Sequence, residues 1–289
     1  MKDYAKSLRD RIAQGGVVAV PGAPDVLTAR LIAQCGFEAV YMTGLGATAS
    51  RLGTPDLGLL SQTEMADQAR SMAAVAGVPV IADADTGYGG PLNLRRVVED
   101  YARAGIAAFH VEDQQMPKRC GQLSGARLVT PREAEARLRA AVAARDASGH
   151  GMLVIGRTDA LGVDGMNAAL ERARRYADTG VDLVFIDGIQ TVEQVEKVAE
   201  GLAGPKVVSI VDGTDAARLG LDEISRMGFT LCLYALTTLL AGLSAQAAAL
   251  AHLRETGGLR TNPDGFDYAR FSGLVDLAGH QAFAHEFET

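Results

Sequence analysis

Eight short runs of β-forming apolar residues alternate with longer stretches of helical periodicity along the chain. The β-like runs begin at Val17, Ala39, Val78, Ala107, Leu153, Leu183, Lys206 and Thr230. The helix-like stretches cover residues 25–36, 62–77, 91–105, 130–147, 164–180, 191–202, 221–228 and 237–256. This alternation predicts an α/β fold, a (β/α)8 TIM-type barrel formed by residues 1–256.

A doubly wound open sheet shows the same alternation and is the alternative fold. No GxGxxG sequence follows the first β-like run, so a dinucleotide site is not supported. Residues 45–61 and 114–129 are longer than usual connections between a strand and a helix, which is typical of loops that form or cover a site. Residues 257–289 are polar and predict a C-terminal extension that packs on the barrel or on a neighbouring subunit.

The charge balance excludes some classes of partner. The chain has 28 Lys and Arg against 35 Asp and Glu, a net charge of -7, which argues against nucleic-acid binding. The longest apolar stretch, 231–253, is interrupted by polar residues, and the first residues contain no apolar block, so neither a membrane span nor a signal peptide is predicted. Three scattered cysteines without metal spacing predict a reducing, cytoplasmic location.

Acidic residues follow several of the predicted strands. Asp83 and Asp85 lie two positions apart at the end of one strand, and Glu112 ends the next. Side chains alternate along a strand, so Asp83 and Asp85 point the same way, and hard carboxylate oxygens suit Mg²⁺. Taken singly, Asp113 or Asp159 is explained equally well by a loop cap or a surface ion pair.

A cysteine stands beside two cations in the long loop 114–129. Lys118 and Arg119 precede Cys120, and neighbouring positive charges favour a thiolate and lower the pKa of a thiol. Cys120 is therefore a candidate proton donor or nucleophile, although an incidental exposed cysteine explains the pattern equally well. The histidines show no ligand spacing, and His110 is interpreted as a core or near-site residue.

Six motifs occur in order along the chain. They are PGAPDVLTARL, YMTGLGATAS, GTPDLG, IADADTGYGG, HVEDQQMPKRCGQLSG and IGRTDA. With these motifs the chain resembles the isocitrate lyase/phosphoenolpyruvate (PEP) mutase superfamily over residues 17–255. The resemblance is to its short branch of methylisocitrate lyase and 2,3-dimethylmalate lyase type. KRCG, which contains Cys120, separates the carbon–carbon lyases from the mutase and the phosphonate hydrolases.

The resemblance implies a role for each matching residue. It implies a site for Mg²⁺, with Mn²⁺ as an alternative, formed by Asp56, Asp83, Asp85 and Glu112, of which Asp85 is the direct ligand. It implies a cradle for the α-keto acid formed by Tyr41, Thr43, Gly44 and Leu45. Arg157 holds the substrate, and Cys120 is the catalytic acid on a mobile loop, beside Lys118. Gly121, Gln122, Asp187 and Ser209 are assigned to substrate binding on the same basis.

The implied reaction is a retro-aldol (retro-Claisen) cleavage of a 2-hydroxy dicarboxylic acid. One product is an α-keto acid, pyruvate or glyoxylate, and the other is a carboxylate enediolate that Cys120 protonates on carbon. The family usually has His at Gln122, Glu at Asp187, and Asn and Glu at Ser209 and Asp212. These departures predict a smaller or differently substituted diacid than isocitrate or methylisocitrate.

Two other functions compete with this one. The first is oxaloacetate or phosphonate chemistry on the same scaffold, against which Cys120 argues. The second is a non-catalytic barrel that binds a small carboxylate. Only the departures at Gln122 and Asp187 support it. The resemblance further implies a homotetramer in which a C-terminal helix is exchanged between subunits.

Overall fold

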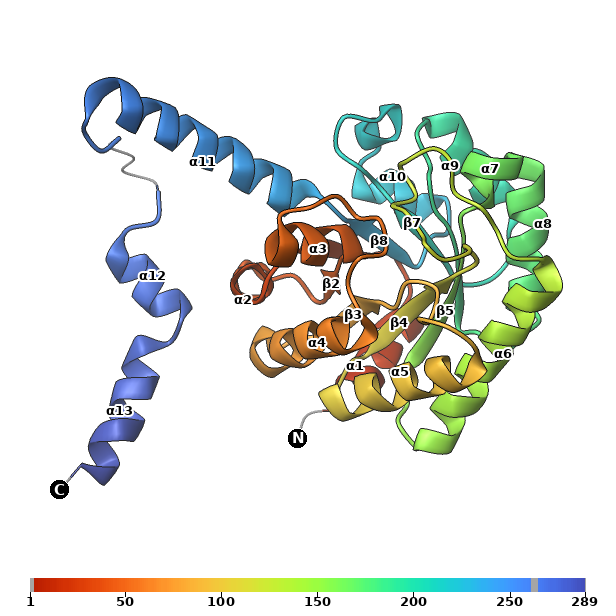
Figure 1. Ribbon diagram of the computed structural model, residues 1–289, viewed down its shortest axis with the longest axis horizontal. Coiled ribbons are helices and arrows are strands. Elements are labelled where there is room, and N and C mark those ends of the chain that lie inside the picture. The colour runs from red at the N-terminus through yellow and green to blue at the C-terminus, as the bar shows by residue number, and fades with distance from the viewer. Residues whose placement is uncertain (1–2, 261–264, 289) are drawn as a thin grey trace. The chain divides into compact units, whose positions relative to one another are not determined.

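Eight parallel strands form a closed barrel in the computed structural model, which describes residues 3–260 and 265–288 (Figure 1). The strands are β1 (Val18–Ala23), β2 (Val40–Met42), β3 (Val80–Asp83), β4 (Ala108–Glu112), β5 (Leu153–Thr158), β6 (Leu183–Ile186), β7 (Lys206–Ser209) and β8 (Leu231–Tyr234). They pair in sequence order, and β8 closes the barrel by pairing with β1, with Val18 opposite Leu231. The predicted (β/α)8 fold is confirmed, and the open sheet is excluded.

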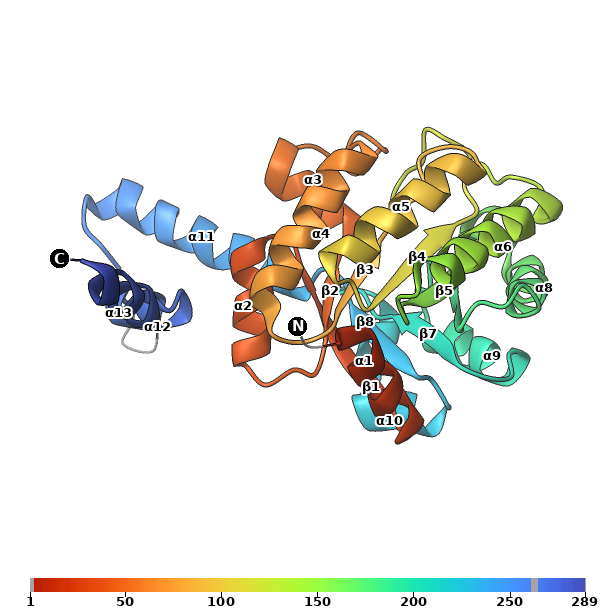
Figure 2. The same cartoon turned by 90° about the horizontal axis from the view of Figure 1, so that it is seen from below.

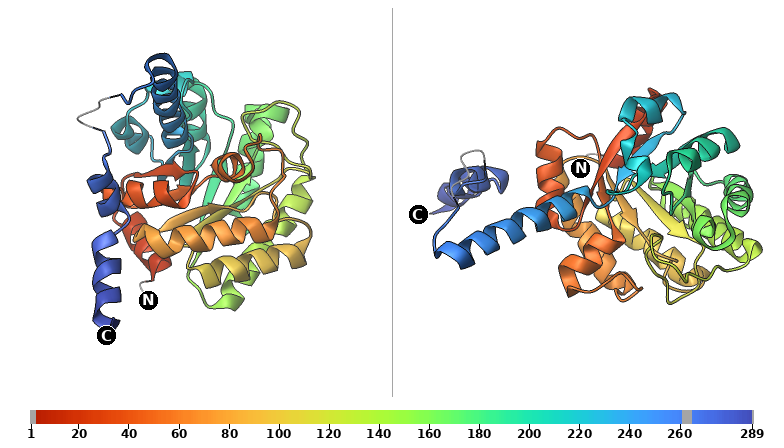
Figure 3. Two further views of the ribbon diagram at one scale, coloured as in Figure 1. Left: turned by 60° about the vertical axis from the view of Figure 1, so that its left-hand side comes forward. Right: turned by 90° about the horizontal axis from the view of Figure 1, so that it is seen from above.

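Helix α1 precedes the first strand, and further helices follow the strands and lie outside the barrel. In the first part of the chain they are α1 (Tyr4–Ala13), α2 (Val26–Gln34), α3 (Gly44–Leu52), α4 (Gln62–Ala76), α5 (Pro91–Ala104), α6 (Pro131–Ser148), α7 (Ala160–Asp164), α8 (Met166–Ala177), α9 (Val192–Gly201), a 3-10 helix (Asp215–Arg218) and α10 (Leu221–Arg226). Helices α4, α5 and α6 lie side by side on the strands (Figure 2). Figure 3 shows these helices against the strands from two further sides.

Part of the predicted loop 45–61 is helical. Helix α3 begins at Gly44, and the Thr43 side chain caps it by accepting a hydrogen bond from the Gly46 backbone at 3.3 Å. The sequence pattern did not predict this helix because its first turn contains two glycines, and glycine disfavours helix interiors. The predicted loop 114–129 has no helix and one isolated bridge between Gln114 and Leu128.

The strands separate two apolar layers. Side chains inside the barrel, among them Val20, Ile81, Ile155 and Phe185, form one buried cluster, and Leu8 of α1 joins it at the amino-terminal end. The other cluster fills the space between the strands and the surrounding helices. Since side chains alternate along a strand, the inward positions that carry apolar residues in the barrel continue as site residues at its carboxyl end.

The chain divides into two compact units, residues 1–238 and 239–289. The predicted boundary at residue 256 coincides with the end of α11 (Thr237–Thr256), whereas the units divide near the start of that helix. The second unit continues with α12 (Tyr268–Leu274) and α13 (Leu277–Phe287), and residues 261–264 of the predicted extension lie outside the described residues. Among the described helices, none combines the length and hydropathy that crossing a bilayer requires.

Candidate active site

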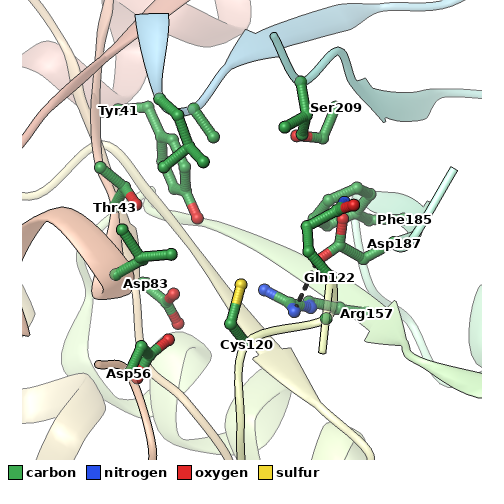
Figure 4. A pocket seen from close by; sticks show the side chains of 15 residues that line it. Tyr41, Thr43, Asp56, Asp83, Cys120, Gln122, Arg157, Phe185, Asp187 and Ser209 are labelled. Atoms are coloured by element: carbon green, nitrogen blue, oxygen red, sulfur yellow. Dashed lines mark ion pairs between the residues drawn. The ribbon is translucent and has the colours of Figure 1, made fainter. Parts of the chain in front are cut away.

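A small cavity of about 40 Å³ opens at the carboxyl ends of the strands, within the first unit (Figure 4). It is lined by Tyr41, Thr43, Leu45, Asp56, Asp83, Cys120, Gly121, Gln122, Arg157, Phe185, Asp187, Ser209, Val211, Ala235 and Leu236. Active sites of (β/α)8 barrels occupy this end, because the loops after the strands converge there. The structure therefore brings together residues that are separated by up to 195 positions in the sequence.

A buried lysine lies between two of the acids. The Nζ atom of Lys118 is 2.7 Å from Asp56 Oδ1 and 2.5 Å from Asp85 Oδ1. Burial alone would lower the pKa of Lys118, but Asp85, Glu112 and their neighbours outweigh it and raise that pKa well above its usual value. Burial raises the pKa of Asp85 to about 6, against the opposing effect of Lys118. Lys118 is thus a fixed counter-charge for the acid cluster.

The acids have the donor chemistry of a divalent-cation site. Both carboxylate oxygens of Glu112 are buried and have no hydrogen-bond partner among the described residues, and burial raises the pKa of that group. Asp83 accepts hydrogen bonds from the Asp85 and Gly44 backbones, at 2.8 and 3.2 Å. In the described part of the chain, no three His, Cys, Asp or Glu side chains form a preassembled metal group. Hard oxygen donors with unmet hydrogen-bonding capacity nevertheless suit Mg²⁺ or Mn²⁺.

Arg157 projects into the cavity from β5 and is surrounded by carboxylates. Its Nη2 atom lies 2.6 Å from Asp187, 2.9 Å from Asp159 and 3.4 Å from Glu112. Glu112 and Arg157 are direct partners in the β4–β5 register, which explains this placement. Burial would lower the pKa of Arg157, but the acids raise it well above the usual value, so the guanidinium stays charged.

Opposite Arg157, a phenol and a helix start face the cavity. The Tyr41 hydroxyl shares a hydrogen bond of 2.9 Å with His110 Nε2, and burial raises the pKa of Tyr41 while lowering that of His110 to about 4. Thr43 precedes the first turn of α3, whose backbone N–H groups attract anions. A Cβ atom on Gly44 would lie 2.5 Å from Asp83 Oδ2, so this approach requires glycine.

The Cys120 side chain points into the same cavity (Figure 4), but the predicted lowering of its pKa is wrong. Burial raises the pKa of Cys120 to about 11, and the negative charge of Asp187 acts in the same direction. The neighbouring cations face elsewhere, because Lys118 pairs with Asp56 and Asp85, and the Arg119 side chain donates to Ser124 O at 2.9 Å. Cys120 is therefore a neutral thiol near neutral pH, which makes it a proton donor rather than a thiolate nucleophile.

Residues 120–122 pack closely against the loop after β6. A Cβ atom on Gly121 would lie 2.5 Å from Asp187 Oδ2, and the Gln122 side chain accepts a hydrogen bond from Gln190. The remaining wall combines Ser209 with apolar groups, namely Phe185, Val211, Ala235 and Leu236. Asp212 does not line this cavity and accepts a hydrogen bond from Thr237 at 2.8 Å.

Phe185 and Gln114 belong to the site but were not predicted from the sequence. Phe185 lies beneath Arg157, with 5.5 Å between the guanidinium carbon and the ring centre. Gln114 is fully buried and bonds to the Cys120 loop and to Asp159. Asp113 accepts hydrogen bonds from Thr158 of β5 and from Arg172 and Tyr176 of α8, so it has a structural role. Successive side chains of a strand point to opposite faces, so Glu112 and Asp113 point in opposite directions. Which of the two faces the site can be told only once the inward face of the barrel is known.

Comparison with known proteins agrees with this geometry. The family model for phosphoenolpyruvate phosphomutase matches residues 8–254. The chain is 35% identical to 2,3-dimethylmalate lyase of Eubacterium barkeri, over 99% of this chain and 98% of that protein. It superposes on oxaloacetate acetylhydrolase in complex with 3,3-difluorooxalacetate with a TM-score of 0.93, at 36% identity over 98% of this chain and 97% of the other.

A third match is a structure with both a metal and a ligand bound. The solved structure of phosphonopyruvate hydrolase in complex with oxalate and Mg²⁺ has a TM-score of 0.88 to this chain, at 26% identity over 99% of each chain. The family model and the 2,3-dimethylmalate lyase match confirm the resemblance inferred from the motifs. The chain belongs to the PEP mutase/isocitrate lyase superfamily and is an enzyme of its lyase-like branch.

Proposed function

We propose that this enzyme is a Mg²⁺-dependent carbon–carbon lyase that cleaves a compact, substituted 2-hydroxy dicarboxylic acid of the methylisocitrate or dimethylmalate type. The products are an α-keto acid, pyruvate or glyoxylate, and a carboxylic acid. The observation that carries the proposal is the neutral Cys120 thiol, which shares a buried cavity with the Arg157 guanidinium and a cluster of acids. A weak acid and a fixed cation are what protonation of an enediolate requires.

Binding and orientation of the substrate fall to two sides of the cavity. The α3 start at Thr43, Gly44 and Leu45, together with the Tyr41 hydroxyl, accommodates the end that becomes the α-keto acid. Arg157 accommodates the other carboxylate and offsets the negative charge that grows on it as the C2–C3 bond breaks. The apolar wall with Val211, Ala235 and Leu236 suits alkyl substituents.

Asp56, Asp83, Asp85 and Glu112 are the residues that would hold the divalent cation. When bound, such an ion offsets charge on the hydroxyl and carboxylate oxygens of a 2-hydroxy acid. The donor chemistry of the cluster and the Mg²⁺ in the phosphonopyruvate hydrolase structure support this assignment, and Mn²⁺ accepts the same ligands.

Cys120 completes the reaction with a proton. Cleavage of the C2–C3 bond leaves its electron pair on the carboxylate fragment, and the thiol transfers its proton to that carbon. The substrate hydroxyl loses its proton to solvent before the loop closes over it, and the Cys120 thiolate regains a proton from solvent after product release, so the enzyme returns to its starting state. The tight packing of residues 120–122 on Asp187 keeps bulk water away from the reactive carbanion.

Hydrolysis of oxaloacetate is a second candidate function. The superposition on oxaloacetate acetylhydrolase favours it, and so does the small cavity. The two reactions release different products, so one product analysis distinguishes the hydrolase from the lyase. Hydrolysis yields oxalate and acetate, whereas lyase cleavage yields an α-keto acid.

A coupled assay for pyruvate and glyoxylate tests the proposal. The substrates are 2,3-dimethylmalate, methylisocitrate, isocitrate, citramalate and oxaloacetate, each with Mg²⁺, with Mn²⁺ and with excess EDTA. We expect an α-keto acid from an alkyl-substituted diacid, loss of activity with EDTA and recovery on addition of Mg²⁺. Oxalate release from oxaloacetate alone would replace the lyase proposal with the hydrolase, and undiminished activity in EDTA would contradict the metal assignment.

We also propose a homotetramer in which the C-terminal unit of one chain covers the barrel of another. An apolar hollow of about 470 Å³ lies outside β1 and β8, lined by Ala19, Pro21, Leu31, Ile32, Cys35, Phe37, Leu221, Tyr234, Thr237 and Thr238. In the second unit, α11 buries no residue, and its side chains Leu243 and Leu250 are 51% and 65% exposed. We also propose a cytoplasmic location, because the three cysteines are free thiols, as is usual in a reducing compartment.

Light scattering coupled to size exclusion tests the assembly. The full chain is expected at about four times its mass of 30.3 kDa. A Leu243→Glu, Leu250→Glu double variant places charges on exposed apolar positions of α11, and we expect it to shift the mass towards smaller species. The matched control is Glu255→Gln on the same helix, which should keep the wild-type mass. A wild-type chain that elutes as a monomer would rule out the tetramer.

A further inference from the structure

The side chain of Gln114 connects the end of β4 to the loop that carries Cys120. It is fully buried, and its amide makes three hydrogen bonds. Oε1 accepts from the Arg119 backbone N–H at 3.0 Å, and Nε2 donates to the Arg119 carbonyl at 2.8 Å and to Asp159 Oδ2 at 3.0 Å. Both backbone groups of the residue that precedes the thiol are therefore satisfied by one amide.

These contacts continue to the substrate-binding cation. The second oxygen of Asp159 accepts from Arg157 Nη2 at 2.9 Å, so Gln114 and Arg157 share one carboxylate. The backbone N–H of Cys120 itself donates a hydrogen bond to the Asp56 carbonyl, at 3.1 Å. The positions of Cys120 and Arg157 are thus linked through two side chains, Gln114 and Asp159.

Only a primary amide of this length satisfies all three contacts. A carboxylate would place negative charge beside Asp159 and the Arg119 carbonyl and would lose both donated hydrogen bonds. Asparagine, one methylene shorter, cannot reach the Arg119 backbone and Asp159 together. An apolar side chain would leave buried backbone groups of the loop without partners, which is costly.

We propose that Gln114 is a positioning residue that holds the Cys120 loop closed and fixes the thiol relative to Arg157. The catalytic part of this proposal rests on the proposed lyase function, whereas the contact between Gln114 and the Cys120 loop is independent of it. Exposed residues follow directly, since Leu123, Ser124 and Gly125 are open to solvent. Lys118 and the Cys120 backbone also bind this loop to Asp56 and Asp85, and Gln114 adds the contacts that hold Arg119 between them.

Alkylation of the three cysteines tests the hold on the loop without requiring turnover. The full-length wild type and Gln114→Leu are treated with iodoacetamide at one fixed pH, and modification of Cys35, Cys120 and Cys232 is followed by peptide mass spectrometry. We expect Gln114→Leu to increase the rate at Cys120 at least about ten-fold, since loss of three hydrogen bonds has that effect on an opening equilibrium even at the low end of their net contribution. Cys232 is buried in β8 and reports general unfolding. Cys35 lines the hollow outside β1 and β8, so an equal Cys35 rate in wild type and variant shows that reagent and assembly are unchanged.

The matched control is Gln115→Leu in the same loop. Gln115 is exposed, and its side chain donates only to the Leu128 carbonyl, at 2.9 Å. This variant should leave the Cys120 rate within about two-fold of wild type. Gln114→Asn is measured alongside, so that a milder variant is available if Gln114→Leu does not fold, and the same rise at Cys120 is expected.

The kinetic readout separates positioning from binding. On the diacid that the wild type cleaves, Gln114→Leu should lower kcat about 100-fold with little change in KM, as expected for a misplaced proton donor. An unchanged Cys120 alkylation rate in both Gln114 variants, or an equal rise at Cys232, would overturn the proposal. If the wild type cleaves no diacid, the lyase proposal fails, and the alkylation result still decides the role of Gln114.

Discussion

Replacing Cys120 with serine should lower kcat/KM by about 10²–10⁴-fold, the range for loss of a general acid. The substitution changes one atom, and a serine hydroxyl is a far weaker acid than the neutral thiol, whose pKa burial raises to about 11. The loop contacts use the Cys120 backbone and the Gln114 side chain, so the loop should remain closed. The measurement is α-keto acid release under steady-state conditions, on the diacid that the wild type cleaves.

Two controls accompany this variant. Calorimetric titration with oxalate in the presence of Mg²⁺ should give the wild-type affinity, because Cys120 is not among the residues assigned to the metal. Cys35→Ser removes an exposed thiol outside the cavity and should keep full activity. A Cys120→Ser enzyme that retains more than a tenth of the wild-type kcat/KM would show that the thiol does not deliver the proton.

Replacing Arg157 with methionine should remove activity and destabilise the fold. Methionine has a similar length but no charge, so Glu112, Asp159 and Asp187 lose the cation that they share. Loss of such a charge-stabilising group costs about 10²–10³-fold in kcat. Removing one partner of a buried ion pair costs about 3–5 kcal/mol of unfolding free energy. Steady-state kinetics and urea unfolding measure the two effects.

Arg175→Met is the matched control for the stability effect. Arg175 also pairs with an acid, Glu135 at 2.5 Å, but its side chain is 42% exposed. An exposed pair contributes no more than about 1 kcal/mol, so this variant should unfold near the wild-type urea midpoint and keep its kcat. Equal losses of stability in both variants would show that burial of the Arg157 cluster has no special energetic weight.

The fold was predictable from the sequence because its signal is local. Each strand is a short apolar run, and the longer helices between strands have their own periodicity and caps, as at Thr130, which accepts from the Glu133 backbone. The short helices α1 and α7 were not predicted. Helix α3 was missed because Gly44 and Gly46 contradict the local pattern, and their helical conformation depends on the Thr43 cap. Tertiary context overrides propensity at this point.

The site was predictable in its residue types and less so in its electrostatics. Sequence neighbours suggested that Lys118 and Arg119 act on Cys120, but Lys118 pairs with Asp56, 62 positions away. The charges that face the Cys120 thiol are set by how the barrel folds. The direction of the Cys120 pKa shift therefore could not be predicted from the residues next to it in the sequence. Gln114 was missed for the same reason, since its partners Arg119 and Asp159 meet only across the folded loop.

The pairing of β8 with β1 has a consequence for how the chain is made. Val18 of β1 and Leu231 of β8 are partners where the barrel closes. The first strand therefore emerges from the ribosome more than 200 residues before β8, its partner on that edge. At about 5–20 residues per second, β1 waits on the order of 10–40 seconds with an unpaired edge. Exposed edges invite pairing with other chains. Until Tyr234 has left the exit tunnel, the nascent chain therefore carries a β1 edge that β8 does not yet cover.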